Sequence, residues 1–204
     1  MPEMSSTVLN LRKTWTKGPH LISTDRTIIP ATTLNTWFAS EEVYWANPMP
    51  EEAMHQTLQN SLCFGLYQKG APDSNAGLDF IGFARCITDT TTFIYLTDVF
   101  VHPSYQGLGL GSWLVACVKE VIETMPYLRR SLLFTGDWRR SVPFYEKIMG
   151  MHVMEGAAPV DGREGTGLAV MQRRFAGAPG VKSVEIGWTG LGSDSSDSID
   201  ADVI

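Results

Sequence analysis

Three glycines at alternate positions, Gly107, Gly109 and Gly111, are the residues in this chain that most clearly indicate a ligand-binding site. They follow an apolar run at residues 93–101 that ends near Pro103, and an apolar helical pattern begins directly after them. Glycine lets a loop backbone approach a ligand closely, and the free N–H groups of a first helical turn attract an anion. The sequence therefore predicts a phosphate-binding loop between a strand and a helix.

Two other glycine-rich phosphate motifs do not fit this segment. A dinucleotide-binding fold requires G-x-G-x-x-G and an acidic residue about 20 positions later. Here the third glycine comes one position too early, and Arg129 and Arg130 stand where the acid belongs. A P-loop requires G-K-[S/T], which the sequence lacks.

The glycine segment and a later tyrosine segment together resemble the GNAT superfamily of N-acetyltransferases. The run Gln106-Gly107-Leu108-Gly109-Leu110-Gly111 is similar to the Q/R-x-x-G-x-G/A signature with which that family binds the pyrophosphate of acetyl-CoA. In the family a helix with a Y-E-K-x-G-F pattern follows. Here Tyr145 begins Y-E-K-I-M-G-M, with one inserted residue and a methionine in place of the phenylalanine. The resemblance covers residues 21–175 and implies acetyl-CoA as co-substrate.

The resemblance implies an α/β (α+β) fold, in which a mixed, mostly antiparallel central sheet of about six to seven strands is flanked by about four helices. Apolar periodicity agrees with that order of elements. It predicts strands at residues 21–29, 61–68, 79–88, 93–101, 131–135, 151–154 and 168–175, and helices at 31–38, 51–60, from the glycines to 125, and 141–149. The strands at 61–68 and 79–88 are apolar on both faces, which predicts that they lie inside a sheet covered on each side.

Composition divides the chain into three segments. Residues 1–19 are predicted to be an N-terminal arm or a late-docking edge, and residues 20–175 the acetyltransferase domain. Residues 176–204 are rich in Gly, Ser and Asp, which predicts a disordered tail. Trp188 within that tail is consistent with a partly ordered segment that docks on the domain.

Charge and hydropathy exclude several classes of function. A net charge of -6 over 204 residues argues against a nucleic-acid partner, because such binding depends on clustered cations. Four arginines do cluster, and we expect them either near CoA phosphates or on a solvated face: Arg129, Arg130, Arg139 and Arg140. No apolar run is long enough to span a membrane, and the N-terminus lacks a signal-peptide pattern. We therefore expect no membrane partner and a cytoplasmic location, with a nuclear one also allowed.

The three cysteines, Cys63, Cys86 and Cys117, are odd in number and each lies among apolar residues. This pattern predicts reduced thiols in the core. No C-x-x-C or H-x-x-x-H spacing occurs, so the sequence predicts no metal site.

The resemblance assigns the binding of acetyl-CoA largely to main-chain atoms. In the family, a bulge on the fourth strand frees N–H groups for the thioester oxyanion and for the pantetheine amides. That stretch corresponds to residues 98–101 here. The residues predicted to bind acetyl-CoA are Val99, Phe100, Val101, Gln106, Gly107, Leu108, Gly109, Leu110, Gly111 and Ser112.

Two side chains are predicted to be catalytic. Tyr145 stands where the family keeps the acid that protonates the thiolate leaving group, although a tyrosine on an amphipathic helix can also simply pack. Asp98 is the preferred base for the amine, because a carboxylate inside an apolar strand is costly without a specific partner. The alternatives for Asp98 are a salt bridge to Arg85 or a hydrogen-bonded bulge, and Glu41 and Glu42 are reserve bases.

Tyr44, Trp45 and Arg85 are the predicted acceptor-binding residues, although an aromatic pair at a helix end more often belongs to a core. The predicted function is acetyl-CoA-dependent transfer of an acetyl group directly to a primary amine, most simply that of a small molecule, for which the acidic balance favours a cation. Protein lysines are an alternative acceptor. A silent acyl-CoA sensor with the same fold and an unrelated nucleotide-binding domain are the alternative functions. The sequence leaves the oligomeric state open.

Overall fold

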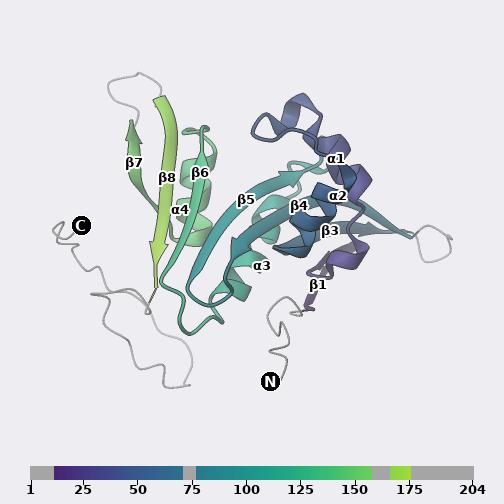
Figure 1. Ribbon diagram of the computed structural model, residues 1–204, viewed down its shortest axis with the longest axis horizontal. Helices are drawn as coiled ribbons and strands as arrows, with labels where there is room; N and C mark the ends of the chain where they lie inside the picture. The colour runs from purple at the N-terminus through teal and green to yellow at the C-terminus, as the bar shows by residue number, and fades with distance from the viewer. Residues whose placement is uncertain (1–11, 71–76, 158–165, 176–204) are drawn as a thin grey trace.

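Figure 1 shows the computed structural model, which describes residues 12–70, 77–157 and 166–175. Its eight-stranded sheet has the strand order β1-β2-β3-β4-β5-β6-β8-β7. Neighbouring strands are antiparallel except β5 and β6, which are parallel. The strands are β1 (Thr14–Lys17), β2 (His20–Ser23), β3 (Leu62–Lys69), β4 (Leu78–Thr88), β5 (Phe93–Val101), β6 (Arg130–Thr135), β7 (His152–Ala157) and β8 (Thr166–Arg174).

Helices cover both faces of the sheet. Helices α1 and α2 pack with Phe83 and Phe100 on one face, and α3 and α4 pack on the other (Figure 1). The helices are α1 (Ala31–Phe38), α2 (Glu51–Gln59), α3 (Leu110–Ile122) and α4 (Ser141–Met149), with short 3-10 turns at η1 (Arg26–Ile28), η2 (Glu41–Val43) and η3 (Pro103–Tyr105). The mixed, mostly antiparallel sheet with four flanking α-helices is the predicted fold class.

Strand β3 shows why the sheet has a core on each face. Phe64 and Leu66 pack in the cluster that contains α3, whereas Cys63 packs in the cluster that contains α1 and α2. Successive side chains of a strand point to opposite faces, so a strand that is apolar at nearly every position must be covered on both. The sequence predicted this burial for β3 and β4.

Strands β5 and β6 pair at one end only. Their parallel register joins Phe93 to Arg130, Ile94 to Ser131 and Tyr95 to Leu132. Beyond this point the two strands diverge, as Figure 1 shows. The rest of β5 therefore presents backbone N–H and C=O groups that β6 does not satisfy, and these must find water or a ligand.

The N-terminal part of the sheet differs from the prediction. Residues 14–17, assigned to an arm or a docking edge, form strand β1 on β2, which brings the strand count to eight. The strand expected at residues 21–29 ends at Ser23 because the Asp25 carboxylate accepts a 3.0 Å hydrogen bond from the Thr27 N–H and begins η1. Asp at such a position competes with strand pairing. Residues 176–204, including Trp188, lie outside the described residues.

The cysteines are free and buried, as predicted. Burial raises the pKa of the Cys63 thiol to about 12 and that of Cys117 to about 12, and it also raises the pKa of Cys86. These thiols stay protonated and belong to the core. In the described ranges, no helix has the length and apolar character needed to cross a bilayer.

Candidate active site

The glycine loop joins β5 to α3 in the predicted order of strand, loop and helix. Gly107 and Gly109 have φ of 78° and 71°, in the left-handed region that favours glycine. A Cβ at either position would meet nothing within 4 Å, so their requirement is backbone conformation and open space. The Gln106 side chain donates a 2.9 Å hydrogen bond to the Val101 carbonyl and fastens the loop to the end of β5.

A cavity of about 560 Å³ opens over this loop and the N-terminus of α3. It brings together all but one of the residues predicted to bind acetyl-CoA, the exception being Leu108, whose side chain is exposed and does not line it. Arg140 lines the cavity, whereas Arg130 donates to Gln172 on β8. The lining residues are Glu42, Tyr44, Trp45, Val99, Phe100, Val101, Tyr105, Gln106, Gly107, Gly109, Leu110, Gly111, Ser112, Asp137, Arg140, Ser141, Phe144 and Tyr145.

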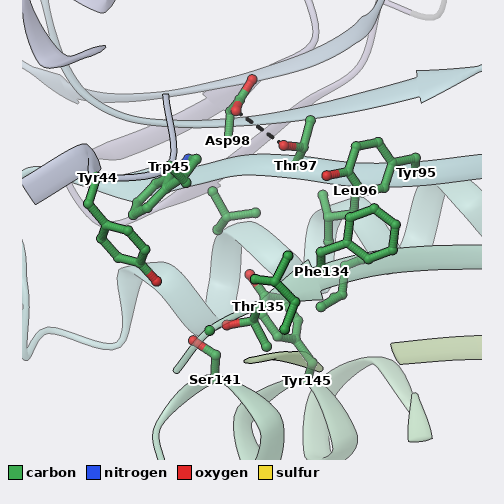
Figure 2. Close-up of a pocket in the computed structure, with 14 residues that line it drawn as sticks. Tyr44, Trp45, Tyr95, Leu96, Thr97, Asp98, Phe134, Thr135, Ser141 and Tyr145 are labelled. Atoms are coloured by element: carbon green, nitrogen blue, oxygen red, sulfur yellow. Dashed lines mark hydrogen bonds between the residues drawn. The ribbon is translucent and has the colours of Figure 1, made fainter. Parts of the chain in front are cut away.

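A second cavity of about 280 Å³ lies where β5 and β6 diverge (Figure 2). It shares Tyr44, Trp45, Val99, Ser141 and Tyr145 with the first, so these residues stand between the two cavities. Its lining residues are Tyr44, Trp45, Tyr95, Leu96, Thr97, Asp98, Val99, Leu133, Phe134, Thr135, Gly136, Ser141, Tyr145 and Leu168.

Helix α4 places Tyr145 at this boundary. Val142 and Met149, three and four positions from Tyr145, are buried in the core and fix the orientation of that helix face. The Asp137 carboxylate accepts a 2.8 Å hydrogen bond from the Arg140 N–H just before the helix begins. Burial raises the pKa of the Tyr145 hydroxyl above its usual value, so the hydroxyl remains a proton donor at neutral pH.

Asp98 occupies a β-bulge in the middle of β5. The register with β4 passes from Arg85 opposite Thr97 to Phe83 opposite Phe100, so β5 contains one extra residue, and Asp98 has φ of 53°. The bulge reverses the side-chain alternation. Before the bulge, Leu96 packs in the cluster that contains α3. After the bulge, Phe100 packs in the cluster that contains α1 and α2.

The Asp98 carboxylate is held by hydrogen bonds from two neighbours, Arg85 and Thr97. The Arg85 Nε donates to Asp98 Oδ2 at 2.6 Å, and the Thr97 hydroxyl donates to Oδ1 at 3.1 Å. Arg85 Nη1 also donates to the Ser61 hydroxyl at 3.2 Å. Asp98 therefore forms the salt bridge to Arg85 and lies in the bulge, the two alternatives that the sequence left open beside a role as the catalytic base. In Figure 2 its carboxylate points away from Tyr145.

The other predicted residues fall into two groups. Tyr44 and Trp45 line both cavities, whereas Arg85 lines neither because its guanidinium is engaged by Asp98. Glu42 lines the larger cavity, and hydrogen bonds from its own backbone N–H and from the Ser40 hydroxyl hold its pKa below the usual value. In the described part of the chain, no group of three metal-binding side chains occurs.

Several lining residues were not predicted. Phe134, Gly136 and Leu168 line the smaller cavity because β6 diverges from β5 here and β8 pairs with β6. This neighbourhood depends on strand order, and no local sequence signal marks it. Ser141 follows the arginine pair at the start of α4, and its place at the boundary depends on how that helix sits.

Asp98→Asn and Asp98→Ala should separate the charge from the backbone conformation. Both leave the largely buried Arg85 guanidinium without its partner, which typically costs about 3 kcal/mol or more of unfolding free energy. Asparagine tolerates the left-handed φ and alanine does not, so the Ala variant should be less stable than the Asn variant by roughly 1–2 kcal/mol. Urea unfolding measures both differences.

The control for this pair is Glu120→Gln, which breaks the exposed ion pair with Lys13 and should cost less than about 1 kcal/mol. Equal stability of the Asn and Ala variants would contradict a conformational role for Asp98. A loss no larger than that of the control would contradict the importance of the buried ion pair.

Comparison with known proteins identifies the family. Residues 31–151 match the sequence profile of the acetyltransferase (GNAT) family. The Gibberella zeae protein FG08082, which is named as an acetyltransferase, is 33% identical over 177 residues that cover 81% of this chain and 97% of that protein.

Solved structures show the same fold. A GNAT-family protein of Xanthomonas campestris is 28% identical, with a TM-score of 0.54 over 70% of this chain and 94% of the other. The spermidine N-acetyltransferase of Vibrio cholerae is 14% identical, with a TM-score of 0.56 over 78% of this chain and 96% of the other, and shows the fold alone. With the glycine loop, the parted strands and Tyr145 in place, the chain belongs to the GNAT family of N-acetyltransferases, which use acetyl-CoA.

Proposed function

We propose that the enzyme transfers the acetyl group of acetyl-CoA directly to the primary amine of a small molecule. The observation that carries this proposal is the position of Tyr145 between two cavities. One cavity is lined by the phosphate-binding loop, and the other has the size of a small-molecule site. A direct transfer needs both substrates to meet at one proton donor, and the contact of Tyr145 with both cavities supports that role for it.

The larger cavity supplies the means of holding a pyrophosphate. The backbone from Gly107 to Ser112 runs into the first turn of α3, where N–H groups are free and the helix dipole favours an anion. Arg140 adds a positive charge on the same cavity. The predicted acetyl-CoA residues other than Leu108 therefore act together, mostly through main-chain atoms.

The unpaired side of β5 supplies donors for the developing oxyanion. Past Tyr95 its backbone is not paired with β6, and residues 96–99 line the smaller cavity. N–H groups fixed in a sheet need no reorganisation as the carbonyl oxygen becomes negative, which is the basis of electrostatic catalysis. Acetyl-CoA contributes a thioester, an activated acyl group with a thiolate leaving group.

The proton balance requires one donor and one acceptor. The amine nitrogen forms a bond to the acetyl carbon, the carbon–sulfur bond breaks, the thiolate gains a proton and the amine loses one. Tyr145 donates to the thiolate and recovers its proton from solvent. Asp98 remains the predicted base that takes the proton from the amine. Because its carboxylate is already hydrogen-bonded to Arg85 and Thr97, water is favoured as the proton acceptor.

Gly109→Val should weaken the binding of CoA. The substitution forces a β-branched residue into a left-handed conformation and places a side chain over the cavity, so we expect the Kd measured by calorimetry to rise at least about tenfold. Gly18→Val is the matched control, because Gly18 also has a positive φ and open space but lies away from both cavities. Both variants should lose similar stability. Unchanged CoA affinity in a folded Gly109→Val protein would exclude the loop as the phosphate site.

Tyr145→Phe should lower turnover and leave CoA binding and stability nearly unchanged. A general acid typically contributes about 100- to 10,000-fold, and kcat and kcat/KM should fall together because the thiolate forms only as the reaction proceeds. The raised pKa of Tyr145 also predicts that kcat/KM of the parent increases with pH as the amine deprotonates, without a decline near pH 10. A Phe variant as active as the parent would show that Tyr145 only packs.

A further inference from the structure

The smaller cavity is lined by aromatic side chains from four different parts of the chain. Tyr44 and Trp45 follow η2, Tyr95 lies on β5, Phe134 on β6 and Tyr145 on α4. Tyr44 and Trp45 meet edge to face with ring centroids 5.1 Å apart, and Tyr95 and Phe134 are tilted at 5.1 Å. Figure 2 shows the two pairs on opposite sides of the cavity.

These rings are exposed to a degree that folding alone does not explain. Tyr44 is 70% exposed, Trp45 42% and Phe134 49%, and Leu168 beside them is 60% exposed. Single exposed apolar residues are ordinary, whereas several gathered at one concave site mark a surface made for a ligand. The site thus leaves aromatic area for an occupant to cover.

Tyr44 and Gly136 line the cavity and lie close to each other. A Cβ on Gly136 would lie 3.8 Å from the Tyr44 hydroxyl oxygen and 3.9 Å from Leu168 Cδ2. The segment after η2 therefore reaches across to the end of β6 and β8. With a volume of about 280 Å³, the cavity falls at the small end of ligand sites and suits a compact body.

Charge in the cavity argues against a polycation. Among the residues that line it, Asp98 is the single one of the Asp, Glu, Lys, Arg and His types, and its carboxylate is paired with Arg85. An acceptor with several ammonium groups would lose water there without gaining a carboxylate partner. A single ammonium, in contrast, is attracted by the faces of tyrosine and tryptophan.

Building on the proposed function, we propose that the acceptor is a small primary amine attached to an aromatic ring by a short linker. The ring packs between the Tyr44–Trp45 pair and the Tyr95–Phe134 pair, and the amine nitrogen faces Tyr145. Such an amine carries one positive charge, so this class narrows the cationic acceptor that the acidic balance of the whole chain favoured to a monocation with an aromatic ring.

The test compares 2-phenylethylamine, n-butylamine and spermidine as acceptors in an assay of thiol release from acetyl-CoA. We expect kcat/KM for 2-phenylethylamine to exceed that for each of the other two at least about tenfold, because only its ring covers the aromatic walls. A peptide with an N-terminal phenylalanine should be a poorer substrate than 2-phenylethylamine.

Phe134→Ala tests the cavity directly, since Phe134 lines the smaller cavity and not the larger one. It should raise KM for 2-phenylethylamine about 5- to 30-fold and leave the KM for acetyl-CoA unchanged, and Phe134→Leu should restore part of the loss. Tyr127→Ala is the control, because Tyr127 is 69% exposed and lines neither cavity. This variant should behave as the parent.

The outcomes separate the acceptor class from the function. Preferred acetylation of spermidine, of n-butylamine or of the peptide would overturn the acceptor class and leave acetyl transfer standing. An unchanged KM in Phe134→Ala would also overturn it. If the protein binds acetyl-CoA and acetylates no amine of the set, with none of the three amines binding to the protein–CoA complex by calorimetry, the proposed function fails together with the acceptor class.

Discussion

One extra residue in β5 is the constraint on which the site depends. The bulge at Asp98 interrupts the register with β4, and the pairing of β5 with β6 ends just before it, at Tyr95. A backbone that left both ladders without support would be unstable, because buried N–H and C=O groups need partners. The ion pair of Asp98 with Arg85 supplies a side-chain anchor at that point, and the parted strands can then face a ligand.

Because of this extra residue in β5, the site offers both main-chain and side-chain groups. The β5 backbone and the glycine loop offer N–H groups, which suit a thioester oxygen and a pyrophosphate. Tyr145 adds a dissociable proton, and its burial keeps that proton in place at neutral pH. The aromatic rings of the smaller cavity add no charge, and in the function that we propose the acceptor is selected by its shape and by ring contacts.

The sequence was most informative where a local requirement is written in residue type. Gly107 and Gly109 need positive φ, and β3 is apolar on both faces, so the loop and the buried sheet were predicted in their observed places. The tyrosine of α4 was found through the family pattern. Strand β1 and the early end of β2 were missed, because a four-residue edge strand has too little periodicity and the Asp25 cap overrides the apolar run.

The walls of the smaller cavity were harder to predict because they depend on tertiary neighbours. That Phe134 and Leu168 line this cavity follows only from the strand order β5-β6-β8 and from the divergence of β6 from β5. The sequence offered Arg85 both as an acceptor-binding residue and as a salt-bridge partner of Asp98, and the register that sets it opposite Thr97 accounts for the observed bond to Asp98.

A crystal structure with acetyl-CoA bound is the most direct test of the central claim, that the parted β5 and the glycine loop form one acetyl-transfer site. The account predicts the pyrophosphate on the N–H groups of residues 107–112 and the thioester carbonyl on the free edge of β5. It also predicts the Tyr145 hydroxyl within hydrogen-bond reach of the sulfur. A pyrophosphate bound away from the loop, or a thioester on the far side of β5 from Tyr145, would contradict it.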